Sequence, residues 1–152
     1  MILDIILEDN PIIRQKSEKI PKVTSEIKEL LRNMSDTLHS QKGLGIAAPQ
    51  VGKNIRAIVV EVDKKYEMIN PVIVKARKPT LSLNEGCLSI PNKTGSVERY
   101  DEIRVEYINR LGSKKVLKAT GMLSFCIQHE IDHLNGILFT DKAVTLIDKN
   151  ND

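Results

Sequence analysis

The sequence has no tryptophan, and aromatic residues of all kinds make up only 3% of its 152 residues. The lysine pairs at 64–65 and 114–115 have no interleaved aromatics, so we expect no direct nucleic-acid site. No stretch approaches the roughly 20 apolar residues that a membrane-spanning helix needs, so we expect no membrane segment. The chain also has no low-complexity segment and no repeat period, which excludes disordered and repeat-protein classes.

The composition that is present is typical of a folded protein, with 41% hydrophobic residues, 28% charged residues and a net charge of +3. A chain of this length predicts a single domain spanning 1–152, which can bury about two thirds of the surface exposed by the unfolded chain. The opening segment 1–10 carries Asp4 and Glu8 and has no basic leader, so it predicts no signal peptide. We therefore expect a cytoplasmic protein in which Cys87 and Cys126 are thiols, available to a metal.

Helical periodicity marks one segment in the first third of the chain. Apolar residues recur at helical spacing between 25 and 42, with Thr24 or Ser25 as the N-cap and Gly43 as the stop. The chain then changes to short β-rich runs punctuated by glycine and proline, and a hairpin turn is expected at 109–113. The predicted strands are 55–62, 68–74, 80–83, 97–108 and 114–119. The segments 43–52 and 84–92 interrupt this pattern, and residues 85–89 within the second are expected to be loop-like.

A second helix is predicted at 122–134, where apolar residues on both faces indicate that the helix is buried. Asn135 and Gly136 behind it are suited to the left-handed conformation at a helix C-terminus. An early helix, then strands, then a second helix favours an α+β domain. We expect mixed or antiparallel sheets wrapped around the buried second helix, with the amphipathic helix 25–42 on the N-terminal side.

The predicted buried helix carries the HExxH pattern His129-Glu130-Ile131-Asp132-His133. Side chains four residues apart lie on one face of a helix, so His129 and His133 can bind one metal ion together. Two of the three histidines of the chain are in this segment. The alternative is a hydrogen-bonded pair of core histidines, but two imidazoles flanking Glu130 are costly to bury without a cation. The pattern therefore favours a metal.

A catalytic metal site needs a third protein ligand and an open position for water. Ordinary HExxH proteases take a Glu or His from beyond the motif, but the residues after His133 contain neither, which argues against an ordinary zincin. Cys126 is a geometric competitor on the same helix, although a small core residue is the simpler interpretation. His39 fits an exposed structural role. Cys87, in a glycine-flanked, loop-like segment, supplies the missing ligand, and the predicted set is Cys87, His129, His133 and water.

Three motifs resemble those of the peptide deformylase family and occur in the same order. They are GLGIAAPQ at 43–50, EGCLS at 85–89 and QHEIDHL at 128–134. Weaker similarity runs from the opening segment through Asp141, which is nearly the whole chain. The resemblance implies a metal-dependent hydrolase that removes the N-terminal formyl group from formyl-methionyl polypeptides and releases formate.

The resemblance also implies roles for residues around the metal. The metal lowers the pKa of its bound water, and the resulting hydroxide attacks the formyl carbon. Glu130 acts as the general base toward the water and then as the general acid toward the departing amine. The developing oxyanion is bound by the side-chain amide of Gln50 and the backbone N–H of Leu88.

Substrate-binding positions follow from the same resemblance. The backbone around Gly45 and Ile46 pairs with an extended peptide, and an apolar slot accepts the methionine side chain. The residues that the resemblance places near this slot are Leu44, Leu83, Met122, Phe125 and Cys126. It also implies that Glu85 and Arg99 pair and brace the cysteine segment, the alternative being a surface ion pair of little energetic value. Asp132 either orients a ligand or caps local backbone.

The resemblance implies one divalent metal ion as cofactor and nascent formyl-methionyl peptides as partners. The ion expected in the cell is Fe²⁺, and the soft ligands also suit Zn²⁺, Ni²⁺ or Co²⁺, which could replace it in a crystal. A ribosome contact is implied as well. However, the long C-terminal helix that docks typical bacterial members is not expected in a chain that stops soon after Ile147.

Two other functions stay open from the sequence. A metallopeptidase would cleave unblocked peptides and would need a third metal ligand downstream of the HExxH pattern. A non-catalytic peptide-binding module with a closed structural zinc would use Cys126 as a fourth ligand and leave no position for water.

Overall fold

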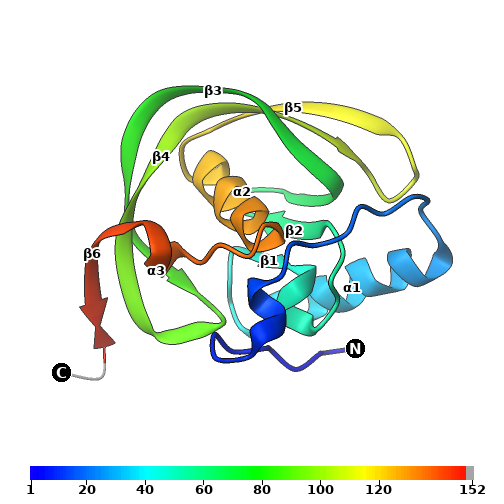
Figure 1. Cartoon of the computed structure of the whole chain (residues 1–152). Coiled ribbons are helices and arrows are strands. Elements are labelled where there is room, and N and C mark those ends of the chain that lie inside the picture. The colour runs from blue at the N-terminus through cyan, green and yellow to red at the C-terminus, as the bar shows by residue number, and fades with distance from the viewer. Residues whose placement is uncertain (150–152) are drawn as a thin grey trace.

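The computed structural model describes residues 1–149, in which a few helices accompany one sheet (Figure 1). The helical elements are η1 (Pro11–Arg14), α1 (Ser25–Ser40), η2 (Ala48–Val51), α2 (Gly121–Leu134) and α3 (Phe139–Lys142). The strands are β1 (Gly45–Ala47), β2 (Ala57–Glu61), β3 (Lys65–Cys87), β4 (Ile90–Ile108), β5 (Lys114–Thr120) and β6 (Ala143–Asp148). The architecture is α+β, as predicted. None of the helices in the described part is long and apolar enough to cross a membrane.

The sheet is antiparallel and follows the order β1-β2-β3-β4-β5, with β6 paired to β4. The register between β3 and β4 shifts at four places between Ile69 and Cys87. Asn70 and Asn84 lie at two of these shifts and adopt positive φ values of 51° and 55°. A bulge bends a strand and increases its twist, so the long β3–β4 ribbon curls around α2 (Figure 1).

Strand β2 lies between the two main helices and is buried on both faces. Because side chains alternate along a strand, Ala57 and Val59 join the core that α1 covers, and Ile58 and Val60 join the core that α2 covers. The hydroxyl of Thr24 caps α1 by accepting a hydrogen bond from the Ile27 N–H, 3.3 Å away. Full burial of a Val or Ile side chain contributes about 1.5–3 kcal/mol, so this three-layer core fixes α2 relative to the sheet.

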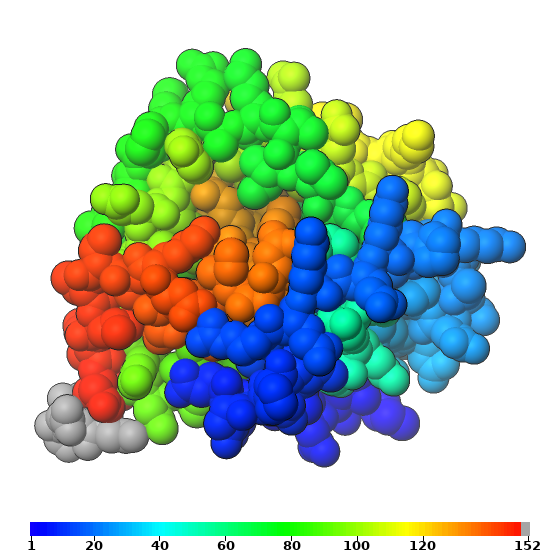
Figure 2. All heavy atoms as spheres, in the orientation of Figure 1, coloured from blue at the N-terminus to red at the C-terminus, as the bar shows by residue number. Residues whose placement is uncertain are grey.

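The N-terminal segment packs against the C-terminal end of α2. Figure 2 shows the blue segment lying directly beside the orange helix end. The Ser17 N–H donates to the carbonyl of Leu134 over 2.7 Å, and Arg14 pairs with Asp141 of α3. Gly136 has the predicted left-handed conformation, with φ of 73°, and a side chain there would collide with the Arg14 carbonyl. The C-terminal end of α2 is therefore fixed by contacts with the N-terminal segment of the chain.

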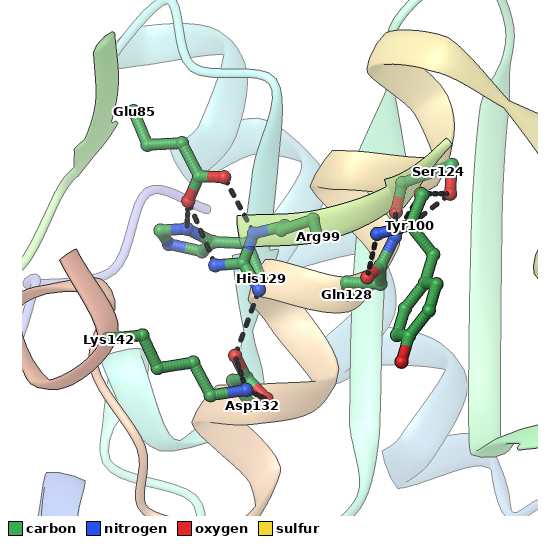
Figure 3. Close-up of polar contacts among 8 residues, drawn as sticks. All are labelled: Glu85, Arg99, Tyr100, Ser124, Gln128, His129, Asp132 and Lys142. Carbon is green, nitrogen blue, oxygen red and sulfur yellow. Dashed lines mark hydrogen bonds and ion pairs between the residues drawn. The ribbon is translucent and has the colours of Figure 1, made fainter. Parts of the chain in front are cut away.

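Helix α2 also takes the place of a strand beside β4. One edge of β4 pairs with β6 over residues 93–97 and with β5 over residues 102–108. Between them, the Gln128 side chain accepts a hydrogen bond from the Tyr100 N–H (3.0 Å) and donates one to the Tyr100 carbonyl (2.8 Å), as Figure 3 shows. The Ser124 hydroxyl donates to the same carbonyl over 2.7 Å. These contacts fix the lengthwise position of α2 against β4.

Several boundaries differ from the sequence prediction. The segment 85–89 was expected to be loop-like, but β3 continues to Cys87 and β4 begins at Ile90, leaving only Leu88 and Ser89 in a tight turn. The predicted strands 68–74 and 80–83 are parts of the same strand, β3. Bulges interrupt the regular alternation of side chains there, so the local pattern resembled separate strands and a loop. Segment 43–52 contains β1 and η2, and β6 was not anticipated.

Candidate metal centre

Three side chains with metal-binding atoms meet where the β3–β4 turn approaches α2. Cys87 ends β3, and His129 and His133 lie one helical turn apart on α2. The ligand atoms of these residues all lie within 4.8 Å of one another, and Cys87 Sγ is 3.3 Å from His133 Nε2. One thiolate and two imidazoles are a donor set that suits zinc, iron, cobalt or nickel. The three predicted ligands are therefore together and fit a metal ion.

Glu85 orients the first of the two histidines. Its Oε1 lies 3.0 Å from His129 Nδ1, which leaves Nε2 as the ring nitrogen available to a metal. The same carboxylate accepts two hydrogen bonds from Arg99, of 2.6 Å from Nε and 2.9 Å from Nη2. Both side chains of this pair are nearly buried, with 2% of Arg99 and 9% of Glu85 exposed. The predicted pair is formed in the interior, not at the surface.

The electrostatic surroundings favour a positive charge at this place. Burial lowers the pKa of His129, but nearby Glu130 and hydrogen bonds to Cys87 and Glu85 outweigh burial and raise the pKa to about 10. Burial raises the pKa of Glu85, yet the hydrogen bonds from His129 and Arg99 bring it down to about 2, so Glu85 is a carboxylate. Burial lowers the pKa of His133, which keeps that ring neutral and able to donate a lone pair. These charges suit a bound cation.

Gln50 is held with its amide N–H groups toward the cysteine turn. In η2, its Oε1 accepts a hydrogen bond from the Ala47 N–H over 2.9 Å. Its Nε2 lies 3.2 Å from Ser89 Oγ and 3.6 Å from Cys87 Sγ. The Gln50 side chain is almost fully buried, so its rotamer is fixed. Leu88, in the same turn, lines the adjoining cavity. Gln50 and Leu88, the two oxyanion donors that the resemblance implies, therefore both line the cavity, and both lie next to Cys87 in space or in sequence.

Glu130 is buried directly beside the glycine of β1. Burial raises the pKa of Glu130 to about 7. Its Oε1 has no hydrogen-bond partner among residues 1–149, and its Oε2 would lie 2.6 Å from a Cβ at Gly45. A carboxyl group with a pKa near neutrality, facing a cavity, can both accept and release a proton.

Replacing Gly45 by alanine should therefore displace the Glu130 carboxylate and lower kcat by about 100-fold, since a misplacement of about 1 Å can cost that much. Metal content and melting temperature should change little. The matched control is Gly86→Ala, because a Cβ at Gly86 meets no atom closer than Thr94 Cγ2 at 3.9 Å. Equal losses of activity in both variants would contradict this explanation.

A cavity of about 440 Å³ opens above these groups. It is lined by Gln50, Cys87, His129 and Glu130 at the polar end. Six of the seven predicted substrate-binding residues also line it, namely Leu44, Gly45, Leu83, Met122, Phe125 and Cys126. Leu83 is 66% exposed and Met122 is 52% exposed, so they lie at the rim. The cavity therefore combines polar groups with an apolar wall, which is the usual character of a ligand site.

Ile46 differs from the other predicted substrate-binding residues. Its side chain is fully buried in the core that α1 covers and does not line the cavity. Alternation along β1 requires this, because Gly45 faces Glu130 and the next side chain must point the other way. Only the backbone of Ile46 is available to a substrate. His39 pairs with Glu61 at 2.9 Å and lies outside the metal-binding cluster.

Cys126 does not belong to the cluster of ligand atoms found among the described residues. Burial raises the pKa of its thiol to about 12, which keeps the sulfur protonated and a poor ligand. The competitor considered from the sequence is therefore part of the cavity wall.

Sequence reasoning did not identify the roles of Ser89 and Lys142. Ser89 lies in the second motif, but its contact with Gln50 depends on the tight turn that was predicted as a loop. Lys142 lies 3.1 Å from Asp132, which in turn accepts a hydrogen bond from Arg99 over 3.0 Å (Figure 3). No local sequence pattern links β4, α2 and α3 in this way.

Comparisons with known proteins agree with this geometry. The sequence matches the Polypeptide deformylase family over residues 2–149. A peptide deformylase of Desulfitobacterium hafniense is 46% identical over 143 residues, which are 93% of this chain and 95% of that protein. The chain belongs to the polypeptide deformylase family. As a deformylase, it is a hydrolase that acts on N-formyl-methionyl peptides and removes the formyl group from nascent peptides.

Solved deformylase structures have the same fold. The crystal structure of peptide deformylase from Thermotoga maritima matches with a TM-score of 0.92 and 31% identity, covering 95% of this chain and 99% of that one. The Met-Ala-Ser-bound crystal structure of the class I type b deformylase of Acinetobacter baumannii has a TM-score of 0.90 and 30% identity, covering 93% and 99%. The resemblance to deformylases that three short motifs indicated is confirmed along nearly the whole chain.

Proposed function

We propose that the deformylase reaction of this chain depends on one divalent metal ion held by Cys87, His129 and His133, and that it releases formate. The observation that carries the proposal is the grouping of these ligand atoms within 4.8 Å at the polar end of the cavity. When bound, the ion supplies Lewis acidity, which makes a water molecule acidic near neutral pH. Fe²⁺ is the proposed ion in the cell, and Zn²⁺, Ni²⁺ or Co²⁺ can take its place.

Glu130 moves the proton in this proposal. Its carboxylate accepts a proton from the attacking water as the water oxygen bonds to the formyl carbon. It then gives that proton to the amide nitrogen as the carbon–nitrogen bond breaks, so the products are formate and a free N-terminal amine. A pKa of about 7 suits both steps, because the group changes its protonation state near neutrality.

The oxyanion that develops on the formyl oxygen is stabilised by Gln50 and Leu88. The Gln50 amide is oriented by Ala47 and Ser89 before substrate arrives, so it needs no rearrangement during the reaction. The backbone N–H of Leu88 is the second proposed donor. A preorganised donor of this kind contributes about 3 kcal/mol to lowering the barrier.

The peptide is proposed to lie along β1. This strand lies at the end of the sheet and pairs with β2 on one edge, through the register Gly45↔Val60 and Ile46↔Val59, and its Gly45 lines the cavity. An extended chain can add to such an edge by backbone hydrogen bonds. The apolar wall then accepts a methionine side chain, in keeping with the Met-Ala-Ser-bound relative. The proposed substrates are nascent formyl-methionyl chains in the cytoplasm, including chains still held by the ribosome.

The test is formate release by protein loaded with Fe²⁺ or Ni²⁺ under anaerobic conditions. Formyl-Met-Ala-Ser should yield formate, and removal of the metal by a chelator should abolish the reaction until metal is restored. Acetyl-Met-Ala-Ser and unblocked Met-Ala-Ser are the comparison peptides and should remain intact. Cleavage of the unblocked peptide would favour a metallopeptidase instead, and full activity in the chelated protein would contradict metal dependence.

A further inference from the structure

A continuous chain of ion pairs connects α3 to a proposed metal ligand (Figure 3). Lys142 Nζ of α3 lies 3.1 Å from the Asp132 carboxylate, and Arg99 Nη1 of β4 donates to that carboxylate over 3.0 Å. The other side of the same guanidinium binds Glu85 of β3, and Glu85 meets His129 Nδ1. The proposed catalytic steps do not use Asp132 or Lys142, so their place in this network needs its own explanation.

Helix capping does not explain the Asp132 side chain. The backbone carbonyl of Asp132 accepts hydrogen bonds from the N–H groups of Asn135 and Ile137, both at 2.9 Å. These bonds close the end of α2 without the carboxylate. The side chain is also absent from the cavity lining, so it does not meet the substrate. Its contacts are with the two cations Arg99 and Lys142.

Arg99 is held from two sides by carboxylates. Its guanidinium is planar and rigid, and it donates two hydrogen bonds to Glu85 and one to Asp132. Only 2% of its side chain is exposed, so water cannot replace a lost partner. Glu85 Oε1 accepts from both Arg99 Nη2 and His129 Nδ1. A rotation of the guanidinium therefore moves the oxygen atom that orients the His129 ring.

Lys142 completes the charge balance and is itself held in place by α3. Two carboxylates, Glu85 and Asp132, face two cations, Arg99 and Lys142, so these four charges balance one another. Phe139, at the start of α3, is buried and stacks on the His129 ring, with ring centroids 6.1 Å apart and planes 23° apart. Helix α3 thus contacts His129 directly through Phe139 and indirectly through Lys142.

We propose that Asp132 is a positioning residue for His129 and that Lys142 holds Asp132 in place. Docking of α3 on α2 thereby sets the orientation of one metal ligand. This inference rests on the proposed binding of a metal by Cys87, His129 and His133.

The test compares Asp132→Asn, Lys142→Met and Lys142→Arg after loading with Co²⁺. The dissociation constant of Co²⁺, from competition with a chelator, and the visible absorption of the bound ion are measured. Asp132→Asn should raise that constant about tenfold and shift the absorption bands, since loss of a partner behind a ligand typically costs about 10–100-fold in metal affinity. Lys142→Met should have a smaller effect of about threefold in the same direction, and Lys142→Arg should restore the original value.

The matched control is Lys78→Met, because Lys78 of β3 and Glu102 of β4 form an ion pair of 2.9 Å with similar exposure that has no hydrogen bond or ion pair to Asp132, Arg99 or His129. This variant should bind Co²⁺ like the unsubstituted protein. An unchanged dissociation constant and spectrum in Asp132→Asn would overturn the inference. A Co²⁺ dissociation constant of Lys142→Met equal to that of Lys78→Met would overturn the part assigned to α3. If the unsubstituted protein binds no Co²⁺, the proposed metal dependence itself fails. Should Asp132→Asn not fold, the exposed Lys142 variants still decide the question.

Discussion

Formate release should fall about a thousandfold when Glu130 is replaced by glutamine, because the amide can neither accept the proton of the attacking water nor deliver one to the departing amine. The substitution keeps the size and shape of the side chain. Burial already disfavours the charged form of Glu130, as its raised pKa shows, so the neutral amide should leave the melting temperature unchanged or slightly higher. Turnover of formyl-Met-Ala-Ser and thermal unfolding are the two measurements.

The metal content of Glu130→Gln is the control for this result. Glu130 lies between the two histidine ligands in the sequence but outside the cluster of ligand atoms, so the variant should bind one metal per chain, as before. A loss of activity accompanied by a loss of metal would assign Glu130 a ligand role. Activity within about tenfold of the original would remove it from proton transfer altogether.

The two cysteines should respond in opposite ways to replacement by serine. Cys87→Ser should lose the metal and the activity, because a serine hydroxyl does not ionise to replace a thiolate. The loss of metal affinity should exceed the roughly 10–100-fold typical of a partner that lies behind a ligand. Cys126→Ser should retain its metal, since the Cys126 thiol is protonated and only lines the cavity. Metal analysis after desalting and formate release measure both effects.

This pair of variants also separates the deformylase arrangement from a closed structural zinc. A closed site needs Cys126 as the fourth ligand, so it predicts that both serine variants lose the metal. Retention of metal by Cys87→Ser would contradict the proposed ligand set. Each cysteine serves as the control for the other, because both are partly buried and differ from serine by one atom.

The parts of the site that were predictable depend on local spacing. His129 and His133 share a helix face, so their joint role requires only that the helix exists. The sequence narrowed the cap of the first helix to Thr24 or Ser25, and the structure has the cap at Thr24. Local spacing alone could not decide between Cys87 and Cys126 as the third ligand. That choice also depended on the absence of a Glu or His after His133 and on the resemblance of the EGCLS motif to the deformylase family.

The parts that were missed depend on contacts between distant segments. Bulges in β3 conceal its continuity, so the end of the strand that carries Cys87 looked like a loop. Ile46 was predicted to bind substrate through its backbone, and the burial of its side chain was not predicted, because that burial depends on alternation along β1, which the sequence did not reveal as a strand. Lys142 and Asp132 are ten residues apart and meet through the return of the chain at Gly136, which no periodic pattern encodes.

The side-chain amide of Gln128 has a consequence for self-association. An uncovered length of strand presents N–H and carbonyl groups that can pair with another molecule, which is a common origin of aggregation. In β4, residues 98–101 lie beyond the reach of both β5 and β6, and Gln128 occupies the N–H and carbonyl of Tyr100 there. The helix that carries two proposed metal ligands therefore also shields this stretch of sheet from intermolecular pairing.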